Sequence, residues 1–208
     1  MALETLTLFA VTIFAISMTP GLCMTLAFSL GMSSGYRRTL WMMLGELAGV
    51  ATVAISVGVG VAQLVQWMPE ALAWLTLLGA LYLVYVGVGM WRSASSALEA
   101  QSGRASFSKI QLAVLGYNTA VLNPKGWAFL IAILPGFINE NDSLLHQLGL
   151  LVPIFLISEF IAMSVYALGG RQLARWFSKP GHSVWLNRLA ATLILFIAIL
   201  FGLGSVNA

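Results

Sequence analysis

Charged residues are scarce in this sequence. Asp, Glu, Lys and Arg make up 8% of its 208 residues, whereas soluble domains carry about 25%. Hydrophobic residues make up 60%. This balance excludes a soluble enzyme or binding domain and predicts an integral membrane protein, with one membrane domain over residues 1–208. The net charge of +3 does not predict a nucleic-acid partner, because the basic residues gather at the ends of apolar runs.

Cysteine and histidine are almost absent. Cys23 has no second cysteine, which excludes an intramolecular disulfide, a Cys-x-x-Cys redox pair and a multi-cysteine metal site. His146 and His182 lie in predicted loops on opposite sides of the membrane, and no apolar run holds a His-Glu-x-x-His motif. We therefore expect no metal site, no cofactor and no enzymatic activity.

Long apolar runs divide the chain into six predicted transmembrane helices. Such a helix needs about 20 apolar residues to cross the hydrocarbon of a bilayer. The first run follows Glu4 rather than a basic segment and is far longer than the apolar part of a signal peptide, so we interpret it as a retained helix. The predicted fold is all-α and integral to the membrane, with helices near 3–30, 40–65, 71–91, 110–138, 144–170 and 189–204.

The charges of the loops predict the orientation of these helices. Loops after the first, third and fifth helices are basic, including the Ser- and Ala-rich segment 92–109. Loops after the second and fourth helices are acidic. Basic loops stay in the cytoplasm, so the alternation predicts a multi-pass protein with both termini outside the cytoplasm.

Two of the predicted helices contain a proline at matching positions. Pro20-Gly21 interrupts the first helix, and Pro124 interrupts the fourth, half a chain length later. Each half, about 1–104 and 105–208, holds three helices, so the two halves would be inverted repeats. Inverted repeats with broken helices are typical of secondary transporters. The alternative is coincidence, since membrane helices tolerate proline.

Three charged residues lie clearly inside predicted helices, away from the helix ends: Glu46, Lys125 and Glu159. A charge within the membrane is costly and by default indicates a functional site. The alternative is a structural ion pair between Lys125 and one of the glutamates. A pair that must break during transport would satisfy both interpretations.

A broken helix offers what a zwitterion needs. The N-terminus of a half-helix exposes unpaired N–H groups and a positive dipole end, which suit a carboxylate. Lys125, directly after the second break, would add positive charge there. A glutamate opposite would accept an ammonium group or exchange a proton. Trp127, away from the predicted membrane interfaces, is a candidate wall of this site. The arrangement predicts a proton-coupled carrier of an amino-acid-sized solute.

The sequence resembles the LysE-type translocator family of bacterial amino-acid exporters over nearly its whole length. The resemblance rests on Met18-Thr19-Pro20-Gly21, on Gly45-Glu46, and on Leu78 to Gly87 in the third helix. The most specific motif is Asn123-Pro124-Lys125-Gly126-Trp127, followed by Leu134-Pro135. Each motif alone is weak evidence, but together, in this order and spacing, they are strong evidence for the resemblance.

The resemblance implies export of amino acids or close derivatives across the inner membrane, driven by a proton or ion gradient without ATP. It implies mechanistic roles for Pro20, Gly21, Glu46, Asn123, Pro124 and Lys125. The sequence departs from the family pattern at Leu22, where a second proline is usual, and at Glu159, which has no counterpart in the pattern.

Other functions are less well supported by the residues. A carrier of another small solute or ion on the same fold is the main alternative. A membrane-embedded thiol relay or metalloprotease would need paired cysteines or a His-Glu-x-x-His motif, which the sequence lacks. A structural or receptor-like membrane protein would have little reason to hold three charges and two matched helix breaks. The expected partners are a small-molecule amino acid, a proton or ion gradient and the lipid bilayer. A homo-oligomer stays open, because lipid-facing and partner-facing surfaces are both apolar.

Overall fold

The computed structural model describes residues 1–68, 71–92, 107–139 and 142–177, together with seven separate positions between 188 and 199. Every regular element in these residues is helical, which confirms the all-α prediction for the described part of the chain. Most of the predicted last helix, 189–204, and most of the predicted loop 92–109 lie outside the described residues.

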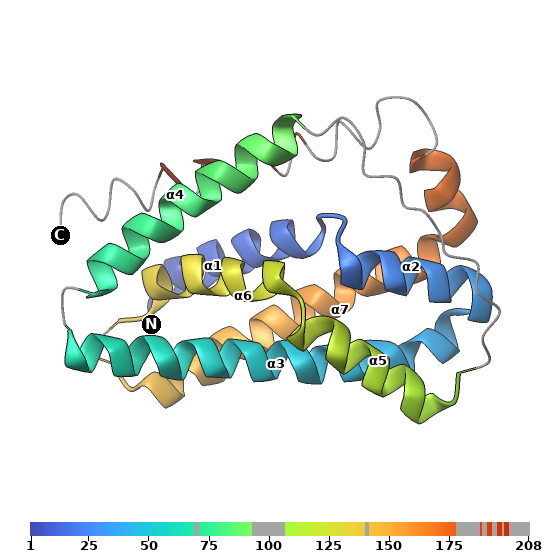
Figure 1. Cartoon of the computed structure of the whole chain (residues 1–208), viewed down its shortest axis with the longest axis horizontal. Helices are drawn as coiled ribbons and strands as arrows, with labels where there is room; N and C mark the ends of the chain where they lie inside the picture. Colours follow the sequence, from blue (N-terminus) through green and yellow to red (C-terminus); the bar gives the residue numbers. More distant parts are fainter. Residues whose placement is uncertain are drawn as a thin grey trace.

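Figure 1 shows the order of the helices, which have short connections except between α4 and α5. Most of their predicted bounds are close to those observed. The fifth predicted helix, however, continues past Gly170 into a basic segment. The elements are α1 (Leu3–Ser17), α2 (Leu22–Ser34), α3 (Tyr36–Trp67), α4 (Ala71–Arg92), α5 (Lys109–Val121), α6 (Pro124–Ile133), the 3-10 helix η1 (Leu134–Phe137) and α7 (Leu144–Phe177).

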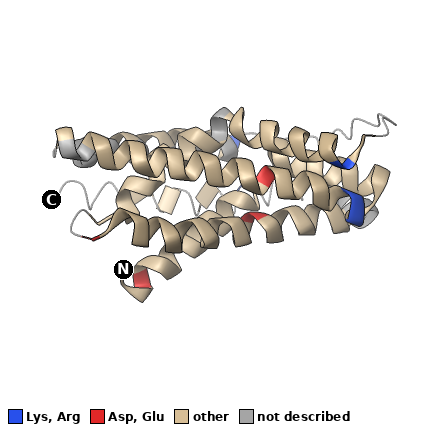
Figure 2. Cartoon of the chain, turned by 90° about the horizontal axis from the view of Figure 1, so that it is seen from below, with Lys and Arg blue, Asp and Glu red and all other residues tan. Residues whose placement is uncertain are grey.

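Two helices in the described residues are long and apolar enough to cross a membrane on their own. They are the stretches 36–64 of α3 and 144–169 of α7. Two further pairs pass the same test when each pair is taken together: α1 with α2, bent by 60°, and α5 with the stretch 126–137, bent by 49°. Figure 2 shows that uncharged residues make up nearly all of the helix length. The protein is therefore a multi-pass membrane protein.

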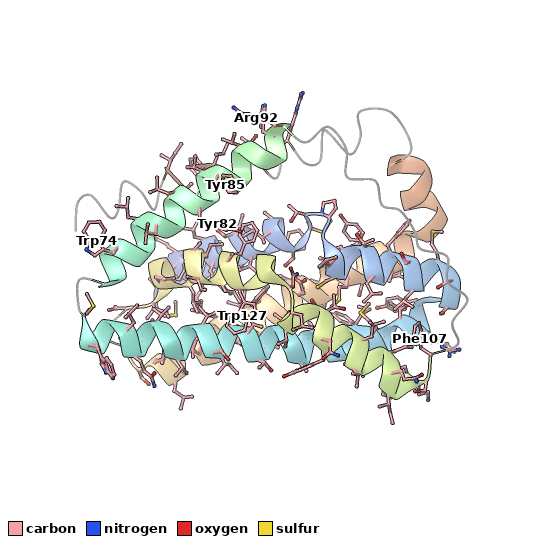
Figure 3. All side chains as sticks on the ribbon, viewed as in Figure 1. Trp74, Tyr82, Tyr85, Arg92, Phe107 and Trp127 are labelled. Carbon is pink, nitrogen blue, oxygen red and sulfur yellow. The ribbon has the colours of Figure 1, made fainter. Side chains whose placement is uncertain are left out.

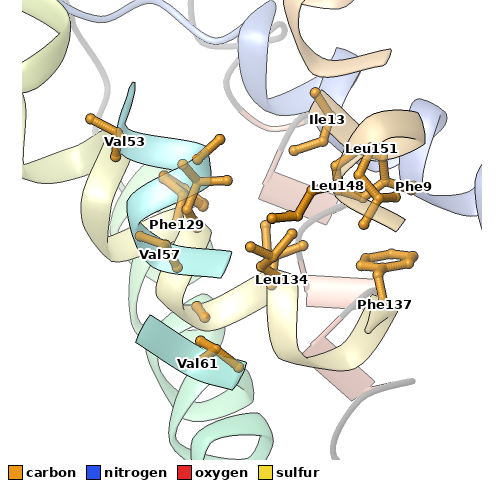
Figure 4. Packing of buried hydrophobic residues seen from close by; sticks show 14 of the residues in the cluster. Phe9, Ile13, Val53, Val57, Val61, Phe129, Leu134, Phe137, Leu148 and Leu151 are labelled. Carbon is orange, nitrogen blue, oxygen red and sulfur yellow. The ribbon is translucent and has the colours of Figure 1, made fainter. Parts of the chain in front are cut away.

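One hydrophobic core fills the end of the bundle where α1, α6, η1 and α7 meet α3 (Figure 4). Phe9 and Phe137 pack edge to face there, with ring centroids 5.0 Å apart. Leu148 and Leu151 of α7 and Val57 of α3 are also buried in this core. A second core joins α2, α3 and α7 at the other end, built on Phe28, Met42, Met43, Met163 and Tyr166.

Glycines allow α3 to approach α5 closely. A Cβ added at Gly45 would overlap the carbonyl group of Ala113, and one added at Gly116 would overlap the carbonyl oxygen of Met42. Backbone contact of this kind is typical of helix pairs in membranes. The hydrophobic effect does not drive helices together there, and small residues allow the close van der Waals packing that does. At Gly35, φ is 79°, a conformation that favours glycine and that lets a single residue join α2 to α3.

Gly45→Ala should destabilise the protein by about 1–3 kcal/mol, because its methyl group would meet backbone rather than a flexible side chain. Gly60→Ala on the same helix is the matched control, since a Cβ there meets nothing within 4 Å. Thermal unfolding of the purified protein in detergent would compare the two variants. Equal Tm values would contradict the close packing of α3 on α5.

Candidate functional site

The first helix break lies between Ser17 and Leu22. Pro20 has no N–H group to donate to the carbonyl of Ile16. The N–H and hydroxyl groups of Thr19 both donate to that carbonyl instead. The carbonyl of Met18 accepts a hydrogen bond from the Tyr166 hydroxyl at 3.0 Å. Side chains therefore satisfy backbone groups that the break releases, as the membrane interior requires.

The second break, between Val121 and Pro124, is stabilised in a similar way. Pro124 cannot donate to the carbonyl of Ala120, which accepts the N–H of Asn123 at 3.2 Å. The indole N–H of Trp127 donates to the carbonyl of Val121 at 2.8 Å. Proline suits the first position of α6, where its N–H would have no helical partner.

A cavity of about 80 Å³ lies between the two breaks. Its walls come from the end of α1, the start of α2, the middle of α3, the α5–α6 break and α7. Most lining residues are apolar. Among the described residues, the polar ones are Ser17, Thr19, Cys23, Glu46, Asn123 and Glu159.

Two carboxyl groups face this cavity. Glu46 on α3 is fully buried, and neither of its oxygens meets hydrogen-bond geometry with a described residue. Glu159 on α7 is 8% exposed and accepts a hydrogen bond from the Ser17 hydroxyl. The two carboxyl groups and the Cys23 thiol are close enough to interact electrostatically. Burying an unpaired carboxylate costs several kcal/mol, so the Glu46 carboxylate would gain free energy by binding a proton or a cation.

Hydrogen-bond donors also line the cavity. Gly21, Leu22, Cys23 and Met24 at the start of α2 line it, and no side chain caps this helix N-terminus. The Asn123 amide nitrogen lies 3.9 Å from the Cys23 sulfur and links the two breaks. The first N–H groups of a helix carry partial positive charge. The cavity thus combines carboxyl groups with anion-favouring donors.

The structure brings four of the residues singled out in the sequence to this cavity: Gly21, Glu46, Asn123 and Glu159. Pro20 lies in the first break beside Gly21. Pro124 and Lys125 begin α6, and their side chains lie outside the described residues.

Trp127 packs at the edge of the first hydrophobic core and donates to the second break. It is not among the described lining residues. Figure 3 places Trp127 within the bundle, whereas Trp74 and Arg92 lie at opposite ends of α4.

Three polar lining residues were not singled out by sequence reasoning: Ser17, Thr19 and Cys23. Each lies within three positions of Pro20. Proximity to the Pro-Gly break is the only signal in the sequence that points to them. Serine and threonine are otherwise common in membrane helices and carry no specific indication.

Comparison with known proteins identifies the family. Residues 14–205 match the LysE type translocator family. An uncharacterized membrane protein of Vibrio cholerae is 27% identical over 187 residues, which cover 90% of this chain and 91% of that protein. A homoserine/homoserine lactone efflux protein of Salmonella typhimurium is 26% identical over 185 residues, which cover 89% of each chain.

An uncharacterized membrane protein of Pseudomonas aeruginosa is 30% identical over 177 residues, covering 82% of this chain and 77% of that protein. No solved structure matches the chain. The family match extends over both helix breaks and over every described lining residue of the cavity except Ile13. The chain therefore belongs to the LysE type translocator family and is a membrane transporter rather than an enzyme.

Proposed function

We propose that this protein is a secondary-active, proton-coupled exporter of amino acids or close derivatives across the inner membrane. The observation that carries the proposal is the buried Glu46 carboxyl group, which faces a cavity between two helix breaks without a hydrogen-bond partner among the described residues. Family membership and the efflux protein of Salmonella typhimurium support the direction and the solute class.

The cavity suits both ends of an amino acid. The N-terminus of α2 and the Asn123 amide would receive the carboxylate. Lys125, in the first turn of α6, would add positive charge on the same side. Glu46 would receive the ammonium group across the cavity. Apolar walls and a small volume favour solutes with short side chains over large or multiply charged ones.

Glu46 also supplies a physical basis for proton coupling. A buried carboxylate without a donor or cation is strongly destabilised, and binding a proton removes that cost. A proton and a solute that both relieve the same destabilisation become thermodynamically linked. Proton entry on the outer side would thus reset the site after release of the solute.

The proposed architecture has six transmembrane helices in two inverted repeats, about 1–104 and 105–208, with the α1–α2 and α5–α6 breaks in matching positions. Contacts at the helix ends are consistent with the predicted grouping of the loops on two sides of the membrane. The terminal amino group of Met1 lies 3.9 Å from Asp142, and both belong to the predicted outer side. Arg38 donates to the carbonyl of Phe107, and Lys109 lies over the Trp41 ring, all at the predicted cytoplasmic side.

The main alternative is a carrier of another small solute or ion. Counterflow in proteoliposomes, with a panel of amino acids and of inorganic cations outside vesicles preloaded with the same solute, would separate the two functions. Accumulation of amino acids supports the proposed exporter, whereas accumulation of inorganic cations alone would replace it.

Glu46→Gln should remove the dependence of export on the pH gradient, because the amide cannot exchange a proton. Transport by proteoliposomes with and without an imposed gradient would measure the coupling. Glu4→Gln, at the exposed start of α1, is the control and should remain coupled. A Glu46→Gln protein that still responds fully to the gradient would exclude Glu46 as the proton site.

Lys125→Ala should lower export at least about tenfold, because a lost interaction with a charged group costs about 1.5–3 kcal/mol. The amount of protein in the membrane should not change. Lys109→Ala, at the exposed start of α5, removes a lysine remote from the cavity and is the matched control. Normal export by the Lys125 variant would remove this residue from the proposed site.

Single cysteines should report the proposed orientation. In a Cys23→Ser background, Ser143→Cys should react with a membrane-impermeant maleimide on intact cells. Ser102→Cys, in the loop 92–109, should react only after the cells are opened. Labelling of Ser102→Cys on intact cells would reverse the proposed topology.

A further inference from the structure

The second carboxyl group of the cavity has no task in the proposed function. Exchange of a proton requires only Glu46, which the family resemblance already singles out. Glu159 belongs to α7, lies 142 residues from Ser17 in the sequence, and yet accepts the Ser17 hydroxyl hydrogen bond. Only 8% of Glu159 and 4% of Ser17 are exposed. Two buried carboxyl groups that interact cannot both stay ionised unless they share a proton or bind a cation.

The residues around Glu46 and Glu159 also favour binding of a cation between the two carboxyl groups. The groups that face Glu46 are the Cys23 thiol from α2 and the Glu159 carboxyl from α7. From the α5–α6 break, the Asn123 amide lies 3.9 Å from the Cys23 sulfur. Lys125 follows two residues later, with its side chain outside the described residues. The rest of the lining is apolar apart from Ser17 and Thr19, so solvent screening of two negative charges would be weak.

Ser17 is the residue that positions the second carboxyl group. It is the last residue of α1, directly before the first break. Its hydroxyl donates to Oε2 of Glu159, which ties α7 to the end of α1. The location of Glu159 in the cavity therefore depends on the geometry of the break.

We infer that Glu46 and Glu159 together bind the protonated amine of the solute, and that one proton occupies the same pair when the amine is absent. This inference extends the proposed export function. When the ammonium group enters, the proton leaves the carboxyl pair for the water on the same side of the membrane. The pair with its occupant carries the same net charge before and after the exchange. Proton and amine thus compete for one site.

The inferred ligand class is a small primary amine with a short apolar body. The amine is the required group, because it alone replaces the proton on the carboxyl pair. A free carboxylate improves binding through the donors at α2 but is not required. Amino acids and their lactones or esters fit this class, whereas N-acylated amino acids do not.

Four related probes separate the two chemical requirements. L-homoserine carries both the amine and the carboxylate, and its lactone keeps only the amine. N-acetyl-L-homoserine keeps only the carboxylate, and its lactone has neither. Equilibrium binding of each radiolabelled probe to the purified protein in detergent is measured between pH 6 and pH 8. Binding does not require transport, so the test is independent of export.

The two amines should bind, and both acetylated probes should bind at least about tenfold more weakly. The apparent Kd of the amines should rise as the pH falls, by up to about tenfold per pH unit where one proton competes. Equal binding of the amines and their acetylated forms, or a Kd independent of pH, would overturn the inference.

Substitutions test the role of the second carboxyl group. Glu159→Gln and Ser17→Ala should both weaken amine binding and flatten its pH dependence, and Ser17→Thr should restore them. Ser158→Ala is the matched control: this neighbouring serine is buried but donates to the carbonyl of Ile154 in its own helix. An unchanged Kd and pH profile in Glu159→Gln would contradict the shared site.

The binding and export experiments distinguish failure of the inferred amine site from failure of the proposed export function. If the amines bind through Glu159 but reconstituted vesicles do not export them, the carboxyl pair stands and the proposed exporter is wrong. If vesicles export amino acids and their acetylated forms equally well, the exporter stands and the amine site is wrong.

Discussion

The need to satisfy backbone groups away from water governs the centre of this protein. Inside a membrane no solvent is available to pair with the carbonyl groups that a broken helix releases. Here the Tyr166 hydroxyl pairs with Met18, and the Trp127 indole pairs with Val121. These two hydrogen bonds allow the chain to keep two bends at the centre of the bundle. The cavity, its donors and its carboxyl groups all lie between those bends.

Two kinds of packing hold the broken helices in place. Rings and aliphatic side chains fill the two ends of the bundle, where α7 and α3 hold the half-helices in place. Between α3 and α5, backbone meets backbone at Gly45 and Gly116. This contact brings Glu46, the next residue after Gly45, toward the α5–α6 break. A single Gly-Glu pair in the sequence thus combines a packing requirement with a chemical one.

Much of the helical architecture could be predicted from the sequence, because apolar runs and charged loops report directly on the membrane. The Gly45-Glu46 motif could be read from the sequence, but the partner of Gly45, the backbone of Ala113, could not. Proline was a less certain guide, since Pro153 lies within α7, which continues past it. The contact of Ser17 with Glu159 could not be predicted, because nothing local relates residues 142 positions apart. The indole hydrogen bond of Trp127 depends on a bend whose angle the sequence does not specify.

The connection at Gly35 has a mechanical consequence. A single residue joins α2 to α3, so these helices form one continuous arm, whereas four residues separate α1 from α2. Glu46 and Cys23 both belong to this arm, whereas Ser17 belongs to α1. A change of angle at Met18–Gly21 would therefore move the arm as a lever and alter the distance between Glu46 and the Ser17–Glu159 pair. The bend that shapes the cavity is also the joint that would open it.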